Sequence, residues 1–191
     1  AKAAVEAARA EVAALIGATP AEIVFTGCAT EANNLALLGA ARAARPGGRT
    51  VLVTSAIEHP SVLNPLRHLE REGWSVTELQ VDAAGQVQSN HAAKHITPEV
   101  ALVSVMLANN ETGSLQAVRA MADLAHAAGA LMHVDAAQAV GKVAVDVNAL
   151  GADLLTLAGH KFYVPKGVGA LFVRTGVVIE PIQYGAGHEH G

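Results

Sequence analysis

A histidine and a lysine stand side by side where a short apolar stretch of the sequence ends. Residues Leu154–Ala158 are typical of a buried strand, and Gly159 interrupts the run before His160 and Lys161. In an open α/β sheet, ligands bind outside the carboxyl ends of the strands. Partial desolvation by the sheet favours a neutral amine at such a place, and a neutral lysine amine can form a Schiff base. Taken alone, Lys161 is more simply interpreted as a solvated surface lysine. The choice between that and a Schiff-base lysine therefore depends on the other residues at the same edge.

Candidate ligand-binding residues also follow four other predicted strands. If these strands are parallel, the residues that follow them converge on one edge of the sheet. In chain order they are Ala29 and Thr30, His59, Asn110, Asp135 and Gln138.

The segment Cys28–Thr30 precedes a helix that we expect from about residue 32 to residue 44. Free backbone N–H groups and the positive end of the helix dipole make such a place an anion site, to which Thr30 adds a hydroxyl donor. The alternative is that Thr30 only caps the helix. Neither a G-x-G-x-x-G pattern nor a G-K-[ST] pattern follows the strand, so a dinucleotide site and a P-loop are not indicated.

Asp135 ends an apolar strand that would otherwise be buried. A buried acid is costly unless a charged or hydrogen-bonding group meets it, and a pyridinium N–H is such a group. Gln138 follows three residues later and could donate to a phenolic oxygen on the same ring. The alternative is that Asp135 caps the turn that follows it.

Three other polar sites have weaker interpretations. His59 could stack on a flat ring or move a proton near neutral pH, or it could be a histidine of a surface loop. Asn110 lies in a loop whose Asn and Gly residues are also ordinary turn residues. His188–His190 offers two histidines with no cysteine nearby, so we expect no metal site.

The chain has 191 residues, a formal net charge of −4 and one cysteine, Cys28. This length suits one domain. The charge argues against binding to nucleic acid, and no apolar run approaches the ~20 residues needed to cross a membrane. A single cysteine excludes an internal disulfide and fits a reducing compartment, so we expect a cytoplasmic protein. Both ends look incomplete, because the chain begins directly as a helix; we expect a longer protein.

Predicted strands and helices alternate along the chain, which indicates an α/β fold of three layers with a mostly parallel sheet, formed by residues 1–191 as one domain. The predicted strands are Glu22–Phe25, Thr50–Thr54, Ser75–Val81, Val100–Met106, Leu131–Asp135, Leu154–Ala158 and Gly169–Val173, with a strand-like Val177–Ile179 after them. The predicted helices are Lys2–Ile16, residues 32–44, Pro60–Glu72, residues 118–128 and a short turn at Asp146–Leu150.

A phosphate site, an acid for a pyridine nitrogen, a stacking histidine and a lysine at a strand end together suggest pyridoxal 5'-phosphate (PLP). The chain also resembles the cysteine desulfurase and selenocysteine lyase family, which belongs to the class-V aminotransferase group of fold-type-I PLP enzymes. The resemblance covers residues 1–191 and rests on five ordered motifs: Thr26–Asn34, Glu58–His59, Asn109–Gly113, His133–Gln138 and Gly159–Lys161.

The resemblance implies a role for each of these residues. Lys161 is the Schiff-base lysine, Asp135 pairs with the pyridine nitrogen, and His59 stacks over the ring and acts in proton transfer. The phosphate is held by the Ala29 backbone, Thr30 and His160. Gln138 bonds the phenolic oxygen, and Asn110 lies beside the ring and the substrate carboxylate.

The chain departs from the family at several places. Ala158 stands where a phosphate-binding Ser is common, Gly27–Cys28 where Ser-Gly is usual, Val164 where Gly is usual and His190 where Arg is common. Cys28 is therefore not expected to be the catalytic cysteine. In the family that cysteine and the arginine that binds the substrate carboxylate lie in a carboxy-terminal domain, and an amino-terminal segment helps to close the site.

The expected function is the PLP-dependent removal of sulfur from L-cysteine to give L-alanine, with a role in iron–sulfur cluster assembly. Selenocysteine lyase activity, another class-V activity such as aminotransfer or kynurenine cleavage, and a non-catalytic assembly paralogue are the alternatives. We expect a homodimer that passes sulfur to an acceptor protein, without nucleic acid or membrane partners.

Overall fold

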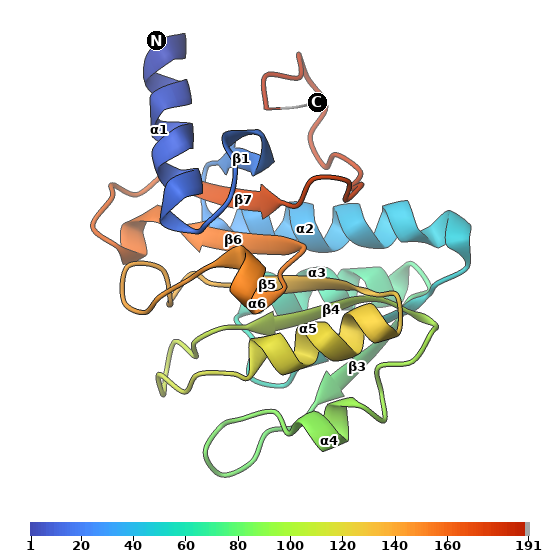
Figure 1. The fold of residues 1–191 in the computed structure, drawn as a ribbon. Helices are drawn as coiled ribbons and strands as arrows, with labels where there is room; N and C mark the ends of the chain where they lie inside the picture. The colour runs from blue at the N-terminus through green and yellow to red at the C-terminus, as the bar shows by residue number, and fades with distance from the viewer. Residues whose placement is uncertain (190–191) are drawn as a thin grey trace.

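The computed structural model describes residues 1–189, in which strands and helices alternate (Figure 1). The strands are β1 (Ile23–Thr26), β2 (Val51–Ser55), β3 (Ser75–Leu79), β4 (Val100–Met106), β5 (Leu131–Asp135), β6 (Leu154–Ala158) and β7 (Gly169–Val173). The helices are α1 (Lys2–Leu15), α2 (Ala29–Ala44), α3 (Pro60–Arg71), α4 (Ser89–Ala92), α5 (Val118–Ala127) and α6 (Val147–Leu150), with 3₁₀ turns η1 (Pro20–Glu22), η2 (Arg45–Gly47) and η3 (Gly159–Lys161).

The strands of the described residues form one sheet in the order β1-β7-β6-β5-β4-β2-β3. β7 runs antiparallel to both of its neighbours, β1 and β6, and the other pairs are parallel. The prediction of a mostly parallel sheet is therefore confirmed. Since β7 is the exception, β1 to β6 all point their carboxyl ends at the same edge.

Helices cover both faces of the sheet and produce two separate cores (Figure 1). On one face, Leu52 of β2 packs in the core to which α2 and α3 contribute. On the other, Val53 packs in the core to which α1 and α5 contribute. β4 is buried along its whole length, as expected of a central parallel strand. The three-layer arrangement agrees with the prediction.

The structure differs from the predicted elements by more than two residues at three places. α2 begins at Ala29, three residues early, because Cys28 is extended and the Glu31 carboxylate accepts the Gly27 N–H, which stabilises the first turn. A short helix, α4, lies in the segment between residues 87 and 98 that we expected to be irregular.

The strand-like Val177–Ile179 is not a strand, so that prediction is wrong. Gly176, with φ +91, starts a turn in which the Val177 N–H donates to the Arg174 carbonyl. The Glu180 N–H then donates to the carbonyl of Gly39 in α2. The segment crosses α2 so closely that a Cβ at Gly39 would lie 2.6 Å from the Glu180 oxygen. It covers the helix instead of joining the sheet.

The described helices include none that is both long and apolar enough to cross a membrane. The predicted departure at His190 lies outside the described residues.

Candidate active site

The carboxyl ends of five parallel strands carry the residues that the sequence predicted for the site. Because β1, β2, β4, β5 and β6 point the same way, the segments that leave them share one edge of the sheet. The residues on these segments are Ala29 and Thr30, His59, Asn110, Asp135 and Gln138, and His160 and Lys161.

Asp135 is the last residue of β5 and is only 5% exposed. Its Oδ1 accepts the Ala137 N–H at 2.9 Å, and its Oδ2 accepts the side-chain amide of Asn33 at 2.8 Å. Burial raises the pKa of the Asp135 carboxyl, while these two donors and the nearby His59 oppose the rise. The carboxylate therefore does cap the turn after β5, and within residues 1–189 it forms no ion pair.

His59 is the N-cap residue of α3 and is exposed. Its Nδ1 accepts the backbone N–H of Ser61 at 3.1 Å and lies 2.8 Å from the Ser61 hydroxyl. Pro60 at the first helical position needs no such acceptor, because proline has no N–H. The ring is thus held at the sheet edge by the start of the helix.

The N-terminus of α2 lies at the same edge with its first turn open. Cys28 occupies the N-cap position without a side-chain hydrogen bond, and Thr30 is the second helical residue. The alternative that Thr30 caps the helix is therefore wrong. The first N–H groups of α2 and the exposed Thr30 hydroxyl together have the chemistry of an anion site.

His160 and Lys161 form the 3₁₀ turn η3 directly after β6, and both are exposed. We expected the sheet to desolvate Lys161, and that expectation is wrong. The turn carries the side chain past the end of β6 into solvent, while Gly159 beneath it is buried.

Two predicted residues make local contacts instead of contacts across the site. The Asn110 amide donates to Glu111 Oε1 at 2.8 Å, and Gln138 Oε1 accepts from Lys142 Nζ at 2.8 Å. Within residues 1–189, hydrogen bonds connect His59 to Asp135 through two other side chains, whereas none joins Lys161 to either of them.

Sequence reasoning assigned no role to three buried polar residues beside the site. Asn33 and Ser61 lie between Asp135 and His59. The Glu58 carboxylate accepts the Ser55 hydroxyl at 2.5 Å and the Met106 N–H at 2.9 Å, and burial raises its pKa to about 8. A signal did exist for Asn33, since it shares its helix face with Ala36, Leu37 and Ala40, where an apolar residue is expected.

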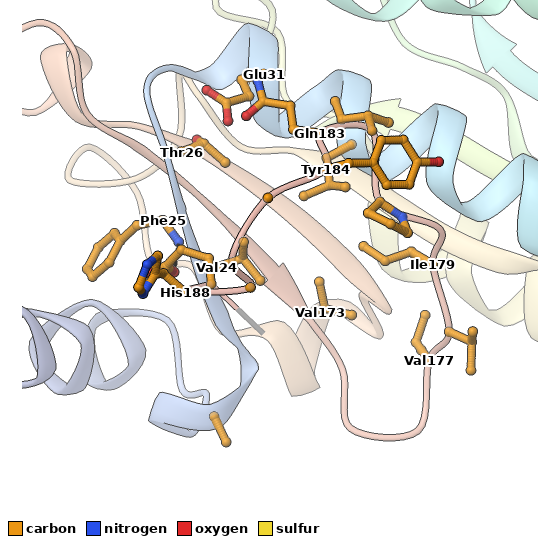
Figure 2. Close-up of a pocket in the computed structure, with 18 of the residues that line it drawn as sticks. Val24, Phe25, Thr26, Glu31, Val173, Val177, Ile179, Gln183, Tyr184 and His188 are labelled. Atoms are coloured by element: carbon orange, nitrogen blue, oxygen red, sulfur yellow. Dashed lines mark hydrogen bonds between the residues drawn. The ribbon is translucent and has the colours of Figure 1, made fainter. Parts of the chain in front are cut away.

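A cavity of about 820 Å³ lies away from Lys161, beneath the segment that follows β7 (Figure 2). Its lining includes Val24 and Thr26 of β1, Glu31 of α2 and residues 173–179 and 181–189. No group of three metal-binding side chains occurs in the part of the chain that the structure describes, which includes His188 and Glu189.

Comparison with known proteins gives consistent matches over nearly the whole chain. The aminotransferase class-V family model matches residues 1–190. The mitochondrial cysteine desulfurase of Drosophila melanogaster is 50% identical over 190 residues, a match that covers 98% of this chain and 41% of that protein. Cysteine desulfurase IscS of Neisseria meningitidis is 48% identical, with 98% and 47% covered.

Solved structures agree with these matches. A structure described as SspA in complex with cysteine superposes with a TM-score of 0.93 at 39% identity, covering 97% of this chain and 54% of that one. DndA from Streptomyces lividans superposes with a TM-score of 0.92 at 42% identity, covering 98% and 54%. This chain spans about half the length of the relatives that it matches.

Proposed function

Because this chain belongs to the class-V aminotransferase family, we propose that it forms the PLP-binding part of a cysteine desulfurase. The observation that carries the proposal is the meeting of Lys161, Asp135, His59 and the open start of α2 at one sheet edge. The names of the relatives support cysteine as the substrate.

The donor set fits PLP. Asp135 is a buried carboxylate that two N–H donors stabilise only in part, and a pyridinium N–H would supply the missing positive partner. The first turn of α2 offers backbone N–H groups to a phosphate. When bound, PLP supplies an electron sink for the negative charge that develops at the substrate Cα.

Each site residue then has a stated task. The Lys161 amine would hold the cofactor covalently until the substrate amine replaces it. His59 would cover the ring and move a proton, while Gln138 and Asn110 would orient the cofactor and the substrate. Thr30, the Ala29 backbone and His160 would hold the phosphate, and we expect phosphate binding to tolerate Ala158 in place of the usual Ser because these donors remain.

The overall reaction needs a thiol nucleophile that we place outside residues 1–191. The sulfur of L-cysteine passes to that thiolate as its C–S bond breaks, and Cβ gains a proton. The products are L-alanine and a persulfide, which an acceptor protein then takes up. Selenocysteine is the alternative substrate, since its C–Se bond can be broken by the same residues.

Self-association is part of the proposal. Tyr163, Tyr184 and Val178 are large apolar or aromatic side chains that are 103%, 86% and 74% exposed, and we propose that a second chain covers them. Size-exclusion chromatography with light scattering would give a dimer mass, and a monomer at micromolar concentration would contradict it.

The decisive experiment is an absorption spectrum of the chain with PLP, before and after borohydride, for wild type and Lys161→Ala. We expect a band near ~400 nm in wild type that borohydride removes while fixing the cofactor to Lys161. Absence of the band in both this chain and the intact protein would contradict the proposal and favour a non-catalytic assembly subunit. Alanine release by the intact protein from cysteine, selenocysteine and kynurenine would then identify the substrate.

A further inference from the structure

Four side chains form a continuous row of hydrogen bonds from β5 to α3. Asn33 Nδ2 lies 2.8 Å from Asp135 Oδ2 and 2.9 Å from Ser61 Oγ, and Ser61 Oγ lies 2.8 Å from His59 Nδ1. Asn33 is fully buried, while Ser61 is 8% and Asp135 is 5% exposed. Hydrogen bonds in such a shielded row are stronger than in water and polarise one another.

The direction of each bond follows from the chemistry of the groups. An amide nitrogen has two N–H donors and accepts nothing, so Asn33 donates to both Asp135 and Ser61. The opposite amide orientation would turn a carbonyl oxygen toward the carboxylate and lose the bond to Asp135. His59 Nδ1 already accepts the Ser61 backbone N–H, so it carries no proton, and the Ser61 hydroxyl donates to it as well. In its neutral form His59 therefore carries its proton on Nε2.

We propose that Asn33 and Ser61 are positioning residues that hold Asp135 as a hydrogen-bond acceptor and His59 as the Nε2–H tautomer. This inference rests on the proposed function, in which Asp135 and His59 contact the PLP ring. That proposal gives Asn33 and Ser61 no contact with the cofactor or the substrate. They connect the residue that would pair with the ring nitrogen to the residue that would cover the ring, so that one network orients both.

Helix capping alone does not account for this row. A cap needs only the Ser61 N–H and His59 Nδ1, whereas Asn33 belongs to a different helix and reaches both partners from a fully buried position. The neighbouring Asn34, by contrast, makes a local hydrogen bond, because its side-chain amide donates to the Thr30 carbonyl within α2. Asn34→Ala is therefore a matched control for Asn33→Ala.

The first test uses the chain without cofactor, so it holds even if PLP does not bind. Long-range ¹H–¹⁵N correlation spectra identify the protonated nitrogen of each histidine. We expect His59 to be protonated at Nε2 in wild type and to show a larger fraction of the Nδ1–H form in Ser61→Ala, because that variant keeps the backbone N–H donor to Nδ1 and loses the hydroxyl donor. A proton on Nδ1 in wild type would overturn the proposal.

The second test follows the Asp135 carboxyl by ¹³C NMR titration, again without cofactor. Asn33→Ala should raise the pKa of Asp135 further, because burial is then opposed by one donor fewer, while Asn34→Ala should leave it unchanged. Equal pKa values in wild type and Asn33→Ala would contradict the proposal.

The third test measures retention of PLP by equilibrium dialysis. The loss of a hydrogen bond to a charged group predicts about tenfold or greater weakening in Asn33→Ala, with Asn34→Ala within about twofold of wild type. Equal retention by the two variants would overturn the link between this network and the cofactor. If wild type retains no PLP while the two NMR results hold, the proposed function fails and the network stands.

Discussion

Arg9 and Glu189 form a bidentate ion pair between the first helix and the end of the described chain. Arg9 Nη1 lies 2.8 Å from Glu189 Oε2, and Nη2 lies 2.7 Å from Oε1. Arg9 is 4% exposed and also donates to the Ile23 carbonyl, while Glu189 accepts the Phe25 N–H. The pair therefore connects α1, β1 and the segment that covers the cavity.

Arg9→Ala should lower the free energy of unfolding by about 2 kcal/mol, because it strands partners that are largely shielded from water. Urea denaturation would measure the loss. Arg119→Ala is the control, since its pair with Asp123 is exposed and should contribute less than about 0.5 kcal/mol. Equal losses of unfolding free energy in the two variants would show that the Arg9–Glu189 pair contributes no more to stability than an exposed pair.

Gly169→Ala should disturb the anion site without replacing a predicted site residue. A Cβ at Gly169 would lie 2.6 Å from the Cys28 carbonyl carbon and 2.9 Å from the Ala29 nitrogen. We expect a loss of about 1–3 kcal/mol in stability and weaker retention of PLP, because the first turn of α2 must shift. Gly47→Ala is the control, because a Cβ at Gly47 has no atom within 4 Å. A Gly169→Ala protein with the stability and PLP retention of wild type would contradict this prediction.

Glu58 should make the protein less stable as the pH rises. Burial raises the pKa of Glu58 to about 8, so between pH ~4.5 and ~8 the unfolded chain has lost a proton that the folded chain keeps. The contribution of Glu58 to stability is greatest below this window and falls across it, by up to about 5 kcal/mol. Glu58→Gln should flatten the decline in urea melts at pH 5 and pH 8. An unchanged slope in the variant would contradict this assignment.

His133 should have the opposite effect on the acid side. It is fully buried between the hydroxyls of Ser104 and Thr156, and burial lowers its pKa to about 3. Below pH ~6.5 the unfolded chain gains a proton at this residue that the folded chain excludes. The contribution of His133 to stability is therefore full above pH ~6.5 and declines toward pH ~3.

His133→Gln keeps hydrogen-bonding groups beside both hydroxyls and should flatten this acid decline, as measured by thermal unfolding from pH 3.5 to pH 7. His188→Gln, at an exposed position, should leave it unchanged. Identical acid profiles in wild type and His133→Gln would assign the decline to other groups.

The sequence was informative wherever a local pattern determines position. Apolar strands followed by polar residues placed Asp135 and Lys161 at the correct sheet edge, because parallel strands share one direction. The resemblance to class-V PLP enzymes is confirmed by the family match and by the solved structures. The roles of the individual site residues stay predictions.

What the sequence did not indicate depends on contacts between distant segments. Ser61 looks like an ordinary first-turn serine, and only the packing of α2 on α3 brings it against Asn33. The exposure of Lys161 depends on how η3 leaves the sheet. Val177–Ile179 has strand-like residues, yet the edge beside β7 is already occupied by β1.

The antiparallel strand β7 has a consequence for how the protein is made. β1 pairs only with β7 in the described sheet, as in Ile23 with Phe172, and these segments leave the ribosome roughly 150 residues apart. Until β7 emerges, β1 has no partner and Gly169 cannot support the start of α2. The start of α2, where we propose that the phosphate binds, is therefore supported only after β7 has been synthesised.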